Sequence, residues 1–177
     1  YLLPALLALV GFFLYVGFYN LYIIQRRVLN IVVGGAAGAI PPLVGYASIS
    51  NSITLEALYL FLIIFFWTPP HFWALAIMIK DDYEKANIPM LPVVKGIKNT
   101  SLQIFLYSII LLFITVLTGV VANSLGWIFM TSSILVGGIF IYKSFKLFKI
   151  ANKKEAISTY IFSLLYLFII MSLVIVD

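Results

Sequence analysis

One short segment of the sequence contains most of the side chains that could bind a metal ion or a phosphate. In it, Asp81, Asp82 and Glu84 are flanked by Lys80 and Lys85. Mg²⁺ prefers oxygen ligands and is commonly bound by one or two carboxylates together with phosphate oxygens and waters. The lysines could then meet the remaining charge of a phosphate group. The alternative is a solvated loop whose charges only fix the topology of the chain.

A second segment, WTPPHFW at positions 67–73, contains His71, the only histidine of the chain. An ionisable residue inside an apolar segment is a functional candidate by default, and imidazole can accept a proton or ligate a metal such as haem iron. It could equally be a neutral ring that is hydrogen-bonded to a backbone carbonyl freed by the double proline. The aromatic residues of this segment could line a pocket for a flat apolar ligand, or they could pack inside the protein or face lipid: Trp67, Phe72 and Trp73.

Two further patterns precede these segments. Tyr22 and Arg26 are four residues apart and therefore share a face of a helix, where a hydroxyl and a guanidinium could hold a diphosphate. They could also be an interfacial tyrosine and a topology-setting arginine. The spacing of Gly34 and Gly38 permits close approach of helices, and Pro41–Pro42 is expected to kink or interrupt the same helix.

Composition assigns these segments to a membrane protein. The chain is 64% hydrophobic and only 10% charged, with a mean hydropathy of +1.16, whereas soluble domains are about 25% charged. Since a span needs about 20 residues, 177 residues leave room for six spans. The absence of cysteine excludes disulfides, thiolate metal sites and cysteine nucleophiles. We predict an all-α bundle with spans at 2–24, 31–50, 55–79, 102–122, 125–147 and 157–176, and a connection at about 80–99 that Pro89 and Pro92 prevent from being one uninterrupted helix.

The basic residues predict how these spans are oriented. All eleven lie in the first, third and fifth connections or in the span end next to them, and none lies in the second or fourth. By the positive-inside rule, the odd connections face the cytoplasm. The net charge of +5 therefore reflects topology, and no nucleic-acid partner is expected. Reporter fusions after Asn51 and after Asn152 should report opposite sides of the membrane; the same side for both would refute this orientation.

Three strings together resemble one family of enzymes. They are NIVVGGAAGAIPPLVG at 30–45, WTPPHFWALAI at 67–77 and KDDYEKANIPMLPVVKG at 80–96. This combination resembles the protoheme IX farnesyltransferase (haem O synthase) family of UbiA-type intramembrane prenyltransferases. The resemblance is dense from about Tyr19 to Gly96, and the last two helices match only in hydrophobicity and position. It implies transfer of a farnesyl group from farnesyl diphosphate to a vinyl group of haem b, with Mg²⁺ as cofactor.

The chain departs from the family pattern in two ways. The family has nine transmembrane helices and two Asp-containing motifs, whereas this chain holds six spans and one acidic cluster. A chain that starts with neither Met nor a leader is expected to be a fragment or a processed product, and we expect a single domain over 1–177 that lacks the N-terminal helices and the first Asp motif. The second motif is commonly Asp-x-x-x-Asp; with Asp82 at its later position, Met78 stands at the earlier one.

The resemblance implies a role for each candidate residue. Asp81 and Asp82 would hold Mg²⁺, and His71 would contact the haem as an iron ligand or a proton acceptor. Arg26 is also expected to be a catalytic residue, together with Asp81, Asp82 and His71. The remaining residues would bind substrate: Tyr22, Arg27, Asn30, Lys80, Lys85, Trp67 and Trp73.

The resemblance also implies a location and partners. The chain would be a multi-pass protein of a prokaryotic cell membrane, with its active site on the cytoplasmic side. Haem A synthase or the terminal oxidase assembly pathway could associate with it. Two alternatives stay open: a UbiA-type enzyme with a quinone-precursor or lipid acceptor, and a transporter or structural subunit. The Pro-Pro pairs at 41–42 and 69–70 superficially resemble the paired broken helices of transporters.

Overall fold

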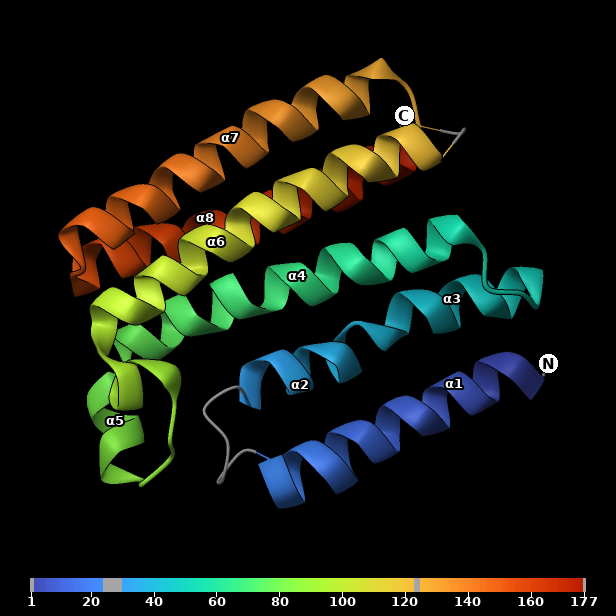
Figure 1. Cartoon of the computed structure of the whole chain (residues 1–177). Helices are drawn as coiled ribbons and strands as arrows, with labels where there is room; N and C mark the ends of the chain where they lie inside the picture. The colour runs from blue at the N-terminus through green and yellow to red at the C-terminus, as the bar shows by residue number, and fades with distance from the viewer. Residues whose placement is uncertain (1, 24–29, 123–124, 177) are drawn as a thin grey trace.

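The computed structural model describes residues 2–23, 30–122 and 125–176, and within them it contains helices and no strands. Six helical segments are long and apolar enough to cross a membrane, as predicted. Figure 1 shows them running roughly side by side. The elements are α1 (Leu2–Phe12), η1 (Phe13–Ile23), α2 (Asn30–Gly38), α3 (Ile40–Ser50), α4 (Leu55–Met78), α5 (Lys80–Lys85), α6 (Leu91–Val121), α7 (Trp127–Ile150) and α8 (Lys153–Val176).

The helix α4 is the centre of the bundle. It packs against α2, α3, α6 and α8, and it is followed by the short helix α5. One apolar cluster surrounds Trp73 and Ile77 near its C-terminal end, and a second surrounds Ile63 and Trp67 further toward its N-terminus. Buried hydroxyl groups on α6 bond to backbone carbonyls one turn earlier, as at Thr100 and Thr115. Such bonds satisfy polar groups where no water is available.

The two double prolines have different effects. The predicted interruption at Pro41–Pro42 is confirmed, because α2 ends at Gly38 and α3 begins at Ile40 with proline in its first turn, where a missing N–H costs nothing. The pair Pro69–Pro70 does not interrupt its helix: α4 is continuous from Leu55 to Met78, which confirms the predicted span at 55–79 and removes the superficial resemblance to paired broken helices. Both prolines of α4 are buried among neighbouring helices, which help a membrane helix tolerate proline.

The predicted connection at 80–99 is largely helical and contains two left-handed residues. It comprises α5 and the first turns of α6, which begins at Leu91 and not near residue 102. The break that the prolines predicted lies at 86–90, and Asn87 has a φ of 56°. Gly96 has φ 77° and ψ 165°, so α6 is kinked there. In Figure 1, α5 lies at one end of the bundle and runs across the direction of the long helices.

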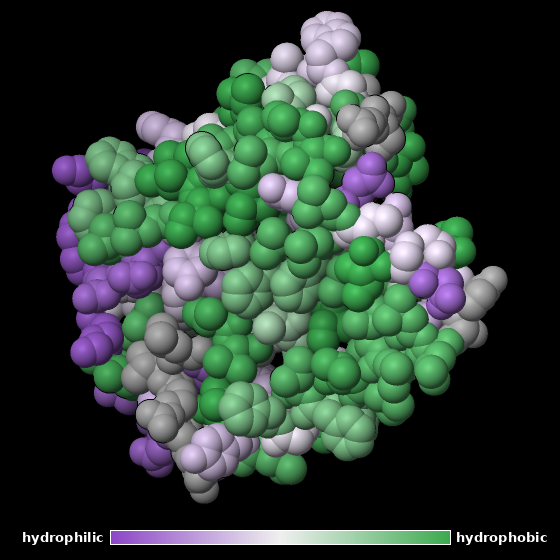
Figure 2. Space-filling model, turned by 45° about the vertical axis from the view of Figure 1, so that its right-hand side comes forward, coloured by the Kyte–Doolittle hydropathy of each residue, from purple (hydrophilic) through white to green (hydrophobic). Residues whose placement is uncertain are grey.

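The charged segments collect at one end of the bundle. The ends of η1 and α4, all of α5 and the turn between α7 and α8 lie at that end, whereas the turn between α3 and α4 lies at the other (Figure 1). Figure 2 shows most of the hydrophilic side chains along one edge, and a mainly apolar surface with a few smaller hydrophilic patches over the rest of that face. The predicted alternation of charged and uncharged connections therefore holds in the fold.

Candidate functional site

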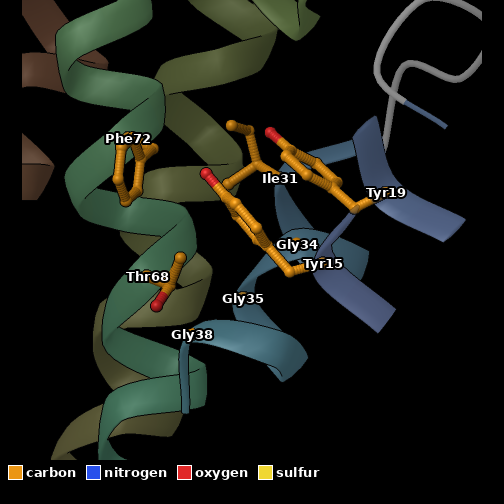
Figure 3. Close-up of a pocket in the computed structure, with 8 residues that line it drawn as sticks. All are labelled: Tyr15, Tyr19, Ile31, Gly34, Gly35, Gly38, Thr68 and Phe72. Carbon is orange, nitrogen blue, oxygen red and sulfur yellow. The ribbon is translucent and has the colours of Figure 1, made fainter. Parts of the chain in front are cut away.

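A cavity of about 190 Å³ lies between η1, α2 and α4. Figure 3 shows that two tyrosines from η1 form one wall, a glycine-rich stretch of α2 forms the floor, and residues of α4 face them. The stacked rings of Tyr15 and Tyr19 have their centroids 5.6 Å apart. The lining residues are Tyr15, Tyr19, Ile31, Gly34, Gly35, Gly38, Thr68 and Phe72. This mostly apolar lining suits a hydrocarbon or an aromatic ligand.

The glycines of α2 are needed for this arrangement. A Cβ atom at Gly34 would lie 2.6 Å from Cε2 of Tyr19, closer than real contacts allow. A Cβ at Gly35 would lie 3.1 Å from Cβ of Thr68, whereas one at Gly38 would meet no atom within 4 Å. The first two glycines therefore let η1 and α4 approach α2, and the third leaves open space in the cavity.

The Gly34 contact yields a prediction. Replacing Gly34 by Ala should displace the Tyr19 ring toward Tyr15 and narrow the cavity, with a loss of about 1–3 kcal/mol of stability, as is usual for overpacking. The melting temperature of the purified protein measures this loss. Gly38→Ala is the matched control, because it adds the same methyl group to the same cavity without a clash. Equal melting temperatures for the two variants would contradict the packing role of Gly34.

The acidic helix α5 lies close to this cavity. Tyr83 of α5 packs against the apolar cluster that contains Ile31, one of the residues that line the cavity. Burial raises the pKa of Tyr83 above its ordinary value. A tyrosine hydroxyl is protonated at neutral pH even without such a shift, so that of Tyr83 can donate a hydrogen bond. The helix that bears the carboxylates is therefore related to the cavity through the packing of Tyr83.

The carboxylates of Asp81 and Asp82 are exposed in the first turn of α5. Their hard oxygen donors suit Mg²⁺ in kind. Over the described residues, however, no three histidine, cysteine, aspartate or glutamate side chains come together as a metal site. Two carboxylates fit a metal that draws its other ligands from phosphate oxygens, water or further residues.

The lysines of α5 differ in their surroundings. The Lys80 ammonium lies 3.7 Å from a carboxylate oxygen of Glu84, one turn away. Such exposed pairs contribute little, so Lys80 can exchange this partner for a phosphate. Lys85 is exposed at the end of α5. Both lysines therefore lie beside the carboxylates, and their binding of a diphosphate stays a prediction.

His71 lies on another side of α4, inside the bundle. Its ring is stacked between Trp67 and Tyr160, at centroid distances of 4.3 and 4.6 Å. Its Nδ1 lies 2.7 Å from Oγ of Ser163, and that hydroxyl also lies 2.6 Å from the carbonyl oxygen of Tyr160. Because a carbonyl can only accept, the serine hydrogen goes to Tyr160, and Nδ1–H of His71 is the donor to Ser163. This tautomer leaves Nε2 as an acceptor.

These contacts make His71 a packed residue of the α4–α8 contact. The backbone carbonyl expected as its partner is replaced by the Ser163 hydroxyl. His71 does not line the cavity of Figure 3. A contact between His71 and haem stays a prediction, and Nε2 is the atom that would make it.

The other predicted residues lie in several places. Trp67 donates its indole N–H to the Ser163 carbonyl at 2.8 Å and, like Trp73, is buried in an apolar cluster. Neither lines the cavity, whereas Phe72 does. Asn30 is fully buried and donates to Sδ of Met90 at 3.3 Å, which joins α2 to the start of α6.

Tyr22 is about half exposed and its ring stacks on Phe18. Arg26 and Arg27 lie outside the described residues, so their predicted roles are untouched by the structure. The sequence reasoning missed Tyr15, Tyr19 and Thr68. The tyrosines could have been found from their spacing of four residues opposite a glycine stretch, but Thr68 gave no signal of its own.

The fold and the site define a polytopic membrane protein in which an acidic helix lies beside an apolar cavity. Residues 1–170 match the UbiA prenyltransferase family, and the chain belongs to that family. Proteins named protoheme IX farnesyltransferase are similar over almost the whole chain. That of Roseiflexus castenholzii is 46% identical over 99% of this chain and 33% of its own length.

Two further relatives carry the same name. The protein of Thermus thermophilus is 45% identical over 99% of this chain and 29% of its own length. That of Ehrlichia chaffeensis is 44% identical over 100% of this chain and 59% of its own length. The chain thus spans between about a third and three fifths of the length of these curated relatives. No solved structure matches it.

Proposed function

We propose that the protein transfers a farnesyl group from farnesyl diphosphate to a vinyl group of haem b, giving haem O. The observation that carries this proposal is the identity of 44–46% along nearly the entire chain to proteins that share one name. The geometry is compatible with a prenyl transfer, because the helix that bears the exposed carboxylates packs through Tyr83 against the cluster that contains Ile31 of the cavity lining. The diphosphate would bind at α5, and the hydrocarbon chain would enter the space between η1, α2 and α4.

The residues of α5 would bind the polar end of the substrate. Asp81 and Asp82 would hold Mg²⁺, whose charge would offset that of the diphosphate as the allylic C–O bond breaks. Lys80 and Lys85 would bind diphosphate oxygens directly, and Tyr83 would donate a hydrogen bond from its protonated hydroxyl. Arg26, Arg27, Tyr22 and Asn30 are proposed to complete the binding of this group from the end of the first span and the start of the second. Further metal ligands would come from outside the described residues.

The apolar cavity would protect the reactive group. An allylic cation reacts rapidly with water, so it needs a dry site until the vinyl carbon attacks. The ring faces of Tyr15 and Tyr19 would also stabilise positive charge next to them. Phe72 and the glycines of α2 line the same space.

The charged end of the bundle is proposed to face the cytoplasm of a prokaryotic cell. Its basic residues lie in the odd connections, which supports this orientation. Association with haem A synthase or with terminal oxidase assembly would follow from the product, because haem O is a precursor used by those systems.

Product analysis tests the proposed reaction. Membranes containing the protein, and in parallel membranes containing the whole protein of a relative as a positive control, are incubated with haem b, farnesyl diphosphate and Mg²⁺. Haem O detected by mass spectrometry is the expected result. A prenylated aromatic acid, formed when quinone precursors are supplied instead of haem, would indicate the alternative acceptor. Turnover of neither acceptor by the protein, beside an active control, would contradict the proposal for this chain.

A further inference from the structure

A second cavity, of about 360 Å³, lies along the N-terminal half of α8 and is closed on one side by α7. It lies at the charged end of the bundle, where the turn between α7 and α8 is found (Figure 1). Lys143, Lys154 and Ser158 line its polar end, and Ile161, Phe162 and Leu165 line the remainder. We name this cavity the α8 groove. It is separate from the cavity between η1, α2 and α4, with which it shares no lining residue.

The polar end of the α8 groove is built to receive an anion. The Lys143 ammonium donates to Oγ of Ser158 at 2.9 Å and lies 5.5 Å from the Phe162 ring centre. Because the serine oxygen accepts from the lysine, its own hydroxyl hydrogen can be donated to a ligand. Lys154 adds a second ammonium at the rim. Three donors therefore meet at one end of the groove.

The charge of these lysines is not offset within the described part of the chain. The nearby carboxylate of Glu155 pairs with Lys146 at 3.0 Å, and it is only 12% exposed. The only other ion pair found among described residues is that of Lys80 and Glu84 on α5. In addition, Lys154 lies in the first turn of α8, where the helix dipole disfavours positive charge. A bound anion would relieve both effects.

The other end of the groove suits a hydrocarbon chain. Ile161 and Leu165 are four residues apart, so they lie on one face of α8, and they are 59% and 48% exposed. They lead from the lysines toward the middle of the span. A soluble phosphate would use only the lysine end, whereas a phospholipid would use both ends at once. Basic pockets between membrane helices are known to take anionic headgroups.

We infer that the α8 groove binds an anionic phospholipid of the leaflet at the charged end of the bundle, with its phosphate on Lys143, Lys154 and Ser158 and an acyl chain along Ile161 and Leu165. The site does not depend on the proposed transferase reaction. It would fix the depth and tilt of α7 and α8 in the membrane, as interfacial basic anchors do.

Native mass spectrometry of the purified protein, titrated with phosphatidylglycerol or with phosphatidylcholine of the same acyl chains, tests the inference. The wild type should retain phosphatidylglycerol preferentially. The double variant K143Q/K154Q should bind it roughly tenfold more weakly, since each basic residue near an anionic lipid contributes several-fold. The double variant K149Q/K153Q removes the same charge from exposed positions that do not line the groove, and it should bind like the wild type.

Three results would overturn the inference. An equal loss in both double variants would mean that surface charge in general attracts the lipid. Equal retention of the two lipids by the wild type would mean that there is no anion site. Displacement of phosphatidylglycerol by millimolar inorganic phosphate would mean that the apolar end contributes nothing. The single variant K154Q changes only an exposed side chain, so it provides the same comparison if K143Q disturbs the contact between α7 and α8.

Discussion

Replacing Asp82 by Ala in the whole enzyme is expected to lower the kcat of the proposed haem O formation by a factor on the order of 10² or more. The physical reason is electrostatic: Asp82 is proposed to hold the cation that offsets the charge of the departing diphosphate, and such groups supply several kcal/mol to the transition state. Because Asp82 is exposed on α5, its loss should not unfold the protein. The rate of haem O formation, followed by chromatography at saturating substrate, measures the effect.

The control for this variant removes a carboxylate elsewhere. Glu56 lies in the first turn of α4, at the opposite end of the bundle, and accepts a hydrogen bond from Tyr46 at 3.3 Å. Glu56→Gln keeps an acceptor for that bond and makes the same change in charge. It should leave haem O formation near the wild-type rate. A nearly normal rate for Asp82→Ala would exclude the metal role of this residue, and Asp81→Ala would then identify whether its neighbour holds the ion.

Replacing His71 by Ala should lower the free energy of unfolding by about 3 kcal/mol, because it leaves a cavity between the rings of Trp67 and Tyr160. It also removes the donor to Ser163. His71→Phe restores an aromatic ring between Trp67 and Tyr160, so most of this stability should return. The melting temperatures of the two variants in the same detergent measure the difference. A wild-type melting temperature for His71→Ala would show that the stack contributes little.

The same pair of variants separates packing from chemistry. His71→Phe keeps the ring and removes Nε2, the atom available to haem. Loss of haem O formation in this folded variant would support the predicted contact with haem. Normal product formation would make His71 a packing residue of the α4–α8 contact, in agreement with its burial. Ser163→Ala, which frees Nδ1 without changing the ring, is the matching test of the tautomer.

The fold could be predicted from the sequence because hydropathy indicates where the membrane helices lie and the basic residues indicate how these helices are oriented. Long apolar runs leave room for little except membrane helices, and the placement of lysine and arginine separates the two ends of the bundle. The break at Pro41–Pro42 was predictable, since proline fits the first turn of a helix. The continuity of α4 agrees with the span predicted at 55–79, but the reason that it tolerates Pro69–Pro70 lies in neighbouring helices that a single segment does not reveal.

The site was predictable only in part. Asp81, Asp82, Lys80 and Lys85 were found because charged residues are rare in this chain. Tyr15 and Tyr19 were missed, since an apolar helix with two tyrosines resembles any interfacial helix. Trp67 and Trp73 were predicted to bind substrate, although the sequence cannot distinguish an aromatic ring in a ligand pocket from one that packs in the protein interior. The structure shows both rings buried in apolar clusters.

Two residues of the segment after α4, Asn87 and Gly96, have backbone conformations with positive φ. Asn87 and Gly96 bracket the stretch that joins α5 to the straight part of α6, and a Cβ at Gly96 would meet no atom within 4 Å. A side chain at Gly96 is therefore disfavoured by the positive φ of the backbone, whereas a side chain at Gly34 is disfavoured by contact with Tyr19. The path of the chain from α5 into the straight part of α6 depends in part on these two backbone conformations. A substitution at either position would therefore alter how α5 is joined to α6 without changing any residue that lines the cavity.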